Sequence, residues 1–220
     1  MTQLRSLLII ASITALLTGF PPVAIAQERE PDPIDKFALD ARVAIPNFPD
    51  DAAIATALAV TTENLPGRGL GISAGAHVYP ARLGRVTLGI GGELLLTRAS
   101  RTLEPATEGG PAGPTVDGRF SALSPQVSLN FGSRRGWSYL SAGIGWGNFT
   151  VERDTAPVQS PDGRLRTLNY GGGARWFAKD HLAFTFDLRF HRFGAQEAIA
   201  GRPAYPAGRM MIFSAGISVK

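Results

Sequence analysis

The stretch 167–194 alternates between two kinds of side chain with a period of two. In its second half, the apolar positions are Leu182, Phe184, Phe186, Leu188 and Phe190. The positions between them are Ala183, Thr185, Asp187, Arg189 and His191. Strands repeat every second residue, whereas helices repeat about every 3.6 residues. The stretch therefore predicts a β-hairpin with one apolar face and one face that carries charge.

Six further runs alternate in the same way, which brings the expected number of strands to eight. These runs cover residues 35–45, 69–80, 86–99, 119–131, 137–150 and 209–220. The connections between the eight runs are long and short in strict alternation, so all long connections would lie on one rim of a barrel and all tight turns on the other. Strands of about ten residues can cross a bilayer when tilted. We therefore predict an all-β fold, an eight-stranded antiparallel transmembrane up-and-down β-barrel over residues 35–220.

Two local features qualify this pattern. Inside the first long connection, residues 50–60 could form a short helix capped by Asp50. Pro125 interrupts the fourth strand and is tolerable only at a bulge or at a weakly paired site, because proline donates no hydrogen bond.

The first 26 residues have the form of a cleaved signal peptide. A basic residue, Arg5, precedes an apolar run, and small residues follow at Ala24 and Ala26. The apolar run is too short to span a membrane as a helix. Residues 27–34 read as an acidic, proline-rich linker. The chain contains no cysteine, which excludes disulfides and thiolate chemistry.

Alternation alone does not say which face of a barrel points outward. A soluble lipocalin-like barrel that binds an apolar ligand would place the apolar face inside. Here the polar face is rich in glycine, serine and alanine, which suits the crowded interior of a narrow barrel. Aromatic residues near the ends of the expected strands fit interfacial girdles, although some could point inward. They are Tyr79, Phe131, Trp137, Phe149, Trp176 and Phe193.

The polar face balances its charges, and we predict that they form a network that closes the lumen. The network comprises Asp40, Arg42, Glu93, Arg175, Asp187 and Arg189, with Gln126, Asn130, His77 and His191 as neutral neighbours. A hairpin turn of three residues places Gly171 opposite Arg189 and Gly173 opposite Asp187, which leaves room to reach a partner such as Arg175 on the diagonal. The alternative is a narrow polar conduit, a pore for small solutes.

Catalysis, metal binding and nucleic-acid binding find little support. Asp187 and His191 lie on one strand face, but at about 3.3 Å per residue they are roughly 13 Å apart. The histidines and carboxylates lack metal-ligand spacing. No cofactor motif is present, since the glycines at 171–173 precede no helix. The arginines are scattered rather than gathered in one nucleic-acid-binding patch.

Three runs carry a resemblance to a known family: LNYGGGARWFAKDHLAFTFDLRFHRF (168–193), YLSAGIGWGNF (139–149) and GLGISAGAHVYP (69–80). They resemble the small eight-stranded outer-membrane β-barrel proteins, the OmpA-type transmembrane domains and porin-like barrels. The resemblance implies a monomer without cofactor or fixed catalytic set. It also implies that the outer-membrane assembly machinery inserts the protein into the bacterial cell outer membrane, among lipid and lipopolysaccharide.

One feature departs from that family. Such barrels usually end in an aromatic residue, and this sequence ends Val219-Lys220. The expected role is structural or one of surface interaction, with an unknown extracellular partner for the long loops, and the protein is not expected to be an enzyme.

Overall fold

The computed structural model describes residues 32–153, 165–195, 197 and 207–220. They belong to one compact unit, Pro31–Lys220. The expected signal peptide (1–26) and most of the expected linker (27–34) lie outside the described residues, as do the middle parts of the last two long connections.

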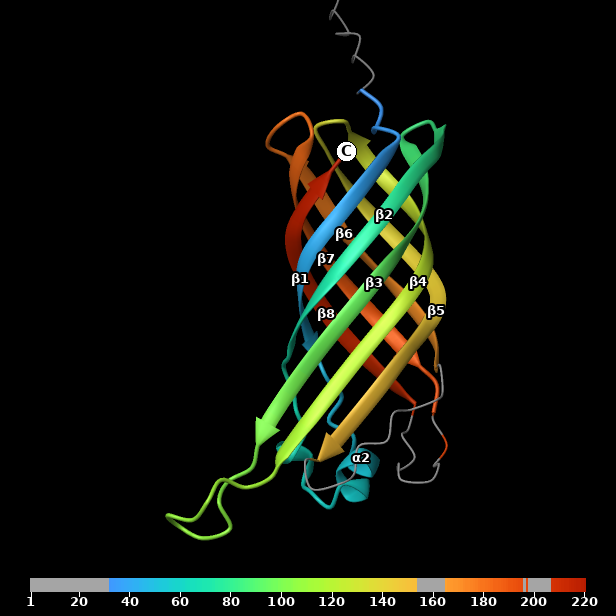
Figure 1. Ribbon diagram of the computed structural model, residues 1–220. Coiled ribbons are helices and arrows are strands. Elements are labelled where there is room, and N and C mark those ends of the chain that lie inside the picture. The colour runs from blue at the N-terminus through green and yellow to red at the C-terminus, as the bar shows by residue number, and fades with distance from the viewer. Residues whose placement is uncertain (1–31, 154–164, 196, 198–206) are drawn as a thin grey trace, which may run out of the picture. The chain divides into compact units, whose positions relative to one another are not determined.

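The described strands form a closed barrel in which each strand pairs with its neighbours in chain order and the first pairs with the last (Figure 1). They are β1 (Phe37–Asn47), β2 (Leu70–Leu83), β3 (Val86–Thr102), β4 (Thr115–Ser133), β5 (Gly136–Arg153), β6 (Leu165–Phe177), β7 (Leu182–Phe193) and β8 (Gly208–Val219). All pairs are antiparallel. The prediction of an eight-stranded up-and-down barrel is confirmed.

The hairpin of β3 and β4 is longer than the apolar alternation indicated. Its strands continue to Thr102 and begin again at Thr115, so the connection that was expected to span 103–118 is shorter. Polar side chains stabilise this extension: Asp117 accepts hydrogen bonds from Arg98 and Ser100, and the hydroxyls of Thr102 and Thr115 are bonded to each other. An alternation of apolar residues cannot reveal a sheet whose outer face is polar.

The two rims differ as expected from the connection lengths. The tight turns and the carboxyl end lie at one rim, and the first two long connections lie at the other (Figure 1). The first long connection contains helix α2 (Ala52–Ala57) and the 3₁₀ turn η1 (Thr62–Asn64). Among the described residues, no helix is long and apolar enough to cross a membrane.

The N-cap of helix α2 lies one residue later than the sequence predicts. Asp51, and not Asp50, accepts the hydrogen bond from the backbone N–H of Ala53, at 2.7 Å. The helix also ends at Ala57 instead of continuing to Val60, and Ala59 adopts a left-handed φ of 53°. A residue in that conformation cannot continue a right-handed helix.

Two prolines interrupt the pairing of the wall in different ways. The ladder of β4 and β5 has no pairs at Ser124 and Pro125 but keeps its register, so Pro125 occupies a weakly paired site. The register shift lies between Val78 and Ala81, around Pro80. Proline has no N–H to donate to the ladder, which makes Pro80 a suitable place for a bulge.

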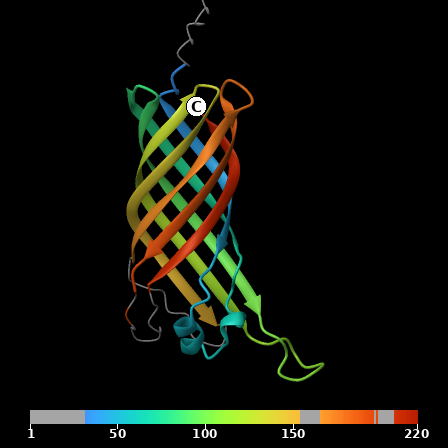
Figure 2. The same ribbon diagram turned by 180° about the vertical axis from the view of Figure 1, so that it is seen from behind.

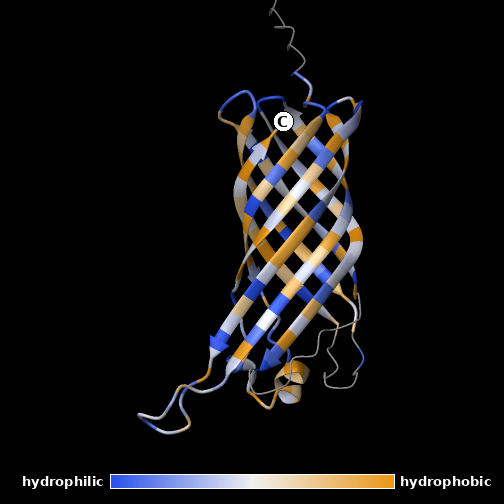
Figure 3. Cartoon of the chain, viewed as in Figure 1, coloured by the Kyte–Doolittle hydropathy of each residue, from blue (hydrophilic) through white to orange (hydrophobic). Residues whose placement is uncertain are grey.

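The apolar face of the wall points outward. Strand β1 alternates exposed and buried residues along its whole length, and every strand carries exposed large apolar side chains, for example Val127 at 63% and Phe184 at 60%. Figure 3 shows apolar and polar residues alternating along the strands. Exposure of so continuous an apolar exterior to water is energetically unfavourable, whereas contact with lipid chains is favourable. The fold is therefore a transmembrane barrel, and the lipocalin-like alternative, with its apolar residues inside, is wrong.

Candidate functional site

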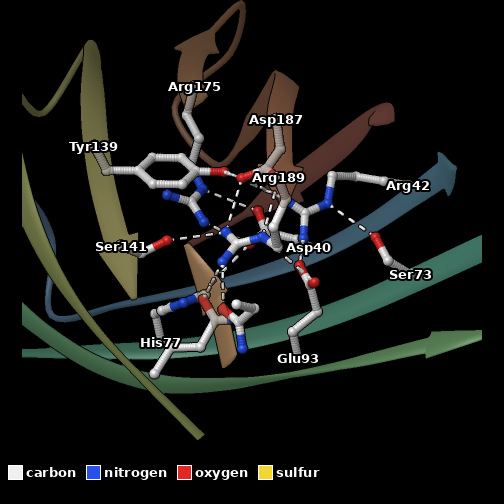
Figure 4. Close-up of polar contacts among 12 residues, drawn as sticks. Asp40, Arg42, Ser73, His77, Glu93, Tyr139, Ser141, Arg175, Asp187 and Arg189 are labelled. Carbon is white, nitrogen blue, oxygen red and sulfur yellow. Dashed lines mark hydrogen bonds and ion pairs between the residues drawn. The ribbon is translucent and has the colours of Figure 1, made fainter. Parts of the chain in front are cut away.

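The six charged residues predicted to share the lumen meet at its centre (Figure 4). They come from four strands and are each at most 5% exposed. They are Asp40 and Arg42 on β1, Glu93 on β3, Arg175 on β6, and Asp187 and Arg189 on β7. Three carboxylates and three guanidinium groups face one another, so the cluster carries no formal net charge.

Arg175 binds Asp40 across the lumen. Its Nε and Nη2 atoms donate to Oδ1 and Oδ2 of Asp40 at 2.9 and 2.5 Å, a two-pronged arrangement that fixes both groups. The guanidinium carbon also lies 4.4 Å from the ring centroid of Tyr139. The expected diagonal contact from β7 to Arg175 is wrong, because Arg175 reaches the opposite wall instead of the neighbouring strand.

Arg189 connects the most groups in the cluster. It holds Asp187 on its own strand, with Nε and Nη2 at 3.1 and 2.9 Å from the carboxylate oxygens. Its remaining hydrogen bonds reach Gln126 at 3.0 Å, Asn169 at 2.9 Å and Ser141 at 2.9 Å. Glu93 lies 3.5 Å from Nε. A buried charge is tolerated only when it is paired and hydrogen-bonded, and Arg189 meets both conditions.

Arg42 completes the cluster from β1. It forms an ion pair with Glu93 and donates to Ser73 Oγ at 3.1 Å and to the Tyr139 hydroxyl at 3.2 Å. The Tyr139 hydroxyl in turn donates to Asp187 Oδ2 at 2.7 Å. The carboxylates of Glu93 and Asp187 are thereby linked through Arg42, Arg189 and one phenol.

Sequence reasoning missed part of this network. The charges and Gln126 were predicted, but Ser73, Tyr139, Ser141 and Asn169 were not. All four lie on the inward face of the alternation, so their position was readable. Their role as hydrogen-bond partners depends on which strands face each other across the barrel. Of the other expected neighbours, His77 lies 3.7 Å from Asp40, whereas the ring of His191 packs against Phe120.

The register of the hairpin is confirmed. Gly171 lies opposite Arg189 and Gly173 opposite Asp187 in the β6–β7 ladder. Gly173 also makes room for Tyr139: a Cβ atom there would lie 2.6 Å from the Tyr139 hydroxyl and 2.1 Å from the Phe186 carbonyl oxygen. The glycine thus permits the phenol to reach Asp187.

Substitution of this glycine tests that role. We expect Gly173→Ala to lower the free energy of unfolding by about 1–3 kcal/mol, because the added methyl group overpacks the lumen and displaces the Tyr139 hydroxyl. A Cβ at Gly92 would meet only the Ser124 carbonyl oxygen, at 3.6 Å. Gly92→Ala is therefore the matched control and should change stability by less than about 0.5 kcal/mol. Equal losses in urea titrations of the two folded variants would contradict this role.

An aromatic layer lies inside the barrel at the tight-turn rim. Trp137 stacks on Phe177 at 5.0 Å and meets Tyr79 edge-on at 5.8 Å. The ammonium of Lys220 lies 3.9 Å from the Phe177 ring centroid and pairs with Asp35 at 2.7 Å. Lys220, at the position where the resembling family usually has an aromatic residue, therefore packs against the aromatic layer.

At the other rim the lumen is filled by an apolar layer. Phe149 stacks on Phe193 at 4.8 Å, and Phe48 from the first long connection packs against Phe149 at 6.2 Å. Ile54 and Leu58 of the same connection join this cluster. Arg153 Nη1 donates to the carbonyl oxygen of Leu58 at 3.0 Å, which holds the end of α2 against the barrel.

Most of the residues expected to form aromatic girdles point inward. Phe131 and Trp176 are exposed on the outer wall, at 40% and 62%. Tyr79, Trp137, Phe149 and Phe193 are buried in the two layers inside the barrel. The parity of each strand decides this, since an aromatic residue one position further along points to the opposite side.

The carboxylates and histidines of the lumen have identifiable neighbours. In the described part of the chain, no group of three or more His, Asp or Glu side chains could hold a metal ion. The carboxylates of the lumen are engaged by arginine, and the His191 ring lies 5.4 Å from that of Phe120 rather than beside Asp187. The arrangement joins side chains from several strands through ion pairs and hydrogen bonds.

The fold can be compared with solved structures. Neisserial surface protein A (NspA) matches with a TM-score of 0.50 and 14% sequence identity over 84% of this chain and 96% of that chain. The Yersinia pestis outer membrane protein Ail matches with a TM-score of 0.41 and 13% identity over 84% and 99%. The Escherichia coli outer membrane protease OmpT matches with 0.40 and 12% identity over 70% and 64%.

No protein-family model matches the chain, and no curated protein sequence matches it. At 14% identity, the similarity to NspA concerns the fold alone. It agrees with the inside-out wall and the single closed sheet. The chain thus has the fold of the small membrane-spanning β-barrels.

Proposed function

We propose that this chain is a monomeric protein of the bacterial outer membrane whose role is structural or one of surface interaction, and that it is not an enzyme. The observation that carries the proposal is the closure of the lumen at three levels. An aromatic layer, the charge network and an apolar layer follow one another from the tight-turn rim to the opposite rim.

This closure argues against the alternative of a narrow conduit. A conduit would need polar side chains that face water along the axis. The charged side chains here are at most 5% exposed and are paired with one another. The apolar layer beyond them offers an ion no compensation for its lost hydration. A channel for small solutes is therefore not the function that the geometry favours.

The surface offered to a partner lies on the long connections. Residues 48–69 fold back over the lumen, whereas the β3–β4 hairpin carries residues 103–114 away from the barrel (Figure 1). Loops that are supported by a rigid scaffold commonly carry binding function. We place the unknown extracellular partner at this hairpin. Insertion would be by the outer-membrane assembly machinery, into lipid and lipopolysaccharide.

The test is insertion without conductance. The mature chain should require detergent for extraction, migrate differently on gels before and after boiling, and give no stepwise current in a planar bilayer. No current is expected because the charge network and the apolar layer fill the interior of the barrel. A chain that stays in solution without detergent would overturn the membrane assignment. Regular current steps from the folded protein would overturn the closed lumen and restore the pore.

A further inference from the structure

A pair of arginines, Arg192 at the end of β7 and Arg209 at the start of β8, lies near the long-connection rim. In Figure 2, β7 and β8 are the orange to red strands, and this rim is at the bottom. Tyr170, Phe190 and Met211 form one cross-strand row on the outer face. The next row on the outer face, two residues nearer to the rim of the long connections, consists of Leu168, Arg192 and Arg209. The outer wall thus changes from apolar to cationic within two residues along each of β7 and β8.

Arg192 and Arg209 are direct cross-strand partners, and both are exposed. Like charges that face each other across a strand pair repel and destabilise the sheet. Within the described residues, no carboxylate forms an ion pair with either guanidinium. The connection 194–207 contains a single acidic residue, Glu197.

The other facing arginine pair of this rim is built differently. Arg98 lies opposite Arg119 on β3 and β4. There, Arg98 Nη2 lies 2.9 Å from Asp117 Oδ1, so an internal carboxylate offsets part of the charge. Among the described residues, the pair on β7 and β8 has no corresponding carboxylate, which makes it a candidate for binding an anionic ligand.

The space between these arginines is hollowed. A pocket of about 460 Å³ is lined by Tyr170, Arg192, Phe193, Ala207, Gly208 and Arg209. Its aromatic neighbours are ordered: Tyr170 stacks on Phe190 at 5.5 Å, and the Arg209 guanidinium lies 5.5 Å from the Phe190 ring centroid. The stacking orients Arg209, which reduces the entropy lost when it binds a ligand.

We propose that this pocket binds the phosphate headgroup of a membrane lipid, with the acyl chains lying on the adjacent row of Tyr170, Phe190 and Met211. Two guanidinium groups present donors in the geometry that phosphate oxygens accept. The lipid, rather than free phosphate, is indicated by the location, because Phe190 and Met211 form the adjacent row of the wall, on the side of the arginines that is away from the rim. The proposal rests on the proposed function in one respect, that the barrel spans a bilayer.

The test measures lipid retention by the folded, full barrel in detergent micelles, by native mass spectrometry. Phosphatidic acid and diacylglycerol with the same chains serve as probes, because they differ only in the phosphate. We expect at least about tenfold preference for phosphatidic acid, and an about tenfold loss of that preference in R192Q/R209Q. The charge-preserving R192K/R209K should fall between the two, since lysine lacks the planar fork.

The matched control is R98Q/R119Q, which removes the same charge from the same rim. It should retain the preference within about twofold, because that pair lies on β3 and β4, away from the pocket, and Asp117 already engages Arg98. Unchanged binding by R192Q/R209Q, verified as folded by its gel mobility, would overturn the site. Full competition by soluble glycerol phosphate would overturn its assignment to a lipid. Because binding is measured in micelles, failure of the barrel to enter a bilayer would count against the proposed function alone.

Discussion

Replacement of Asp40 with alanine is expected to lower the free energy of unfolding by about 3–5 kcal/mol, because it leaves the Arg175 guanidinium buried without its counter-charge. Arg175 is 1% exposed, so contact with bulk solvent does not compensate the loss. The measurement is a urea titration of the barrel reconstituted in lipid vesicles, monitored by tryptophan fluorescence and by gel mobility.

Two controls separate the buried pair from ordinary charge removal. Asp117→Ala removes an acid that pairs with the 60% exposed side chain of Arg98, so it should cost no more than about 1 kcal/mol. In the double variant Asp40→Ala/Arg175→Met, the loss should be smaller than in Asp40→Ala alone, since an apolar side chain replaces the orphaned charge. If the stability loss of the double variant equalled the sum of the losses of Asp40→Ala and Arg175→Met, the two residues would act independently.

Truncation of Phe149 is expected to have an effect of similar size at the other end of the lumen. This side chain is fully buried and packs against Phe48, Phe120 and Phe193. Phe149→Ala should cost about 3–5 kcal/mol, since the loss of apolar burial adds to the cavity left behind. The same urea titration measures this loss.

Phe149→Leu is the matched control, because it keeps most of the volume and should cost less than about 1.5 kcal/mol. Truncation also removes the ring on which Phe48 rests, so protease cleavage within residues 48–69 should accelerate in Phe149→Ala and not in Phe149→Leu. Equal stability losses in the two variants, with unchanged cleavage, would mean that the first long connection is held by other contacts.

The architecture was readable because strand alternation is a local property. Each inward or outward position follows from its neighbour two residues away, so the eight strands, the sorting of connections and the register of Gly173 with Asp187 could be derived from short segments. The limits of the strands were less readable where the alternation became polar, as in the extension of β3 to Thr102.

The partners within the lumen were not readable for the opposite reason. Arg175 and Asp40 are 135 residues apart in the chain, and only the closure of β1 on β8 places them across from each other. The membership of the charge network could be predicted, since parity and charge select it. Its pairing could not, because strand tilt and stagger decide which layers of the barrel coincide.

The amino-acid sequence by itself therefore determined the class of the fold, the inward charges and the glycines that make room for them. The tertiary structure alone decided that Arg175 binds Asp40, that four of the end-of-strand aromatics point into the barrel, and that Phe48 and Lys220 pack against aromatic rings at its two ends. It also decided that Arg192 and Arg209 face each other over an apolar row. The physical reason is that alternation sets the side of the wall, whereas the closed ladder sets the height at which residues from different strands meet.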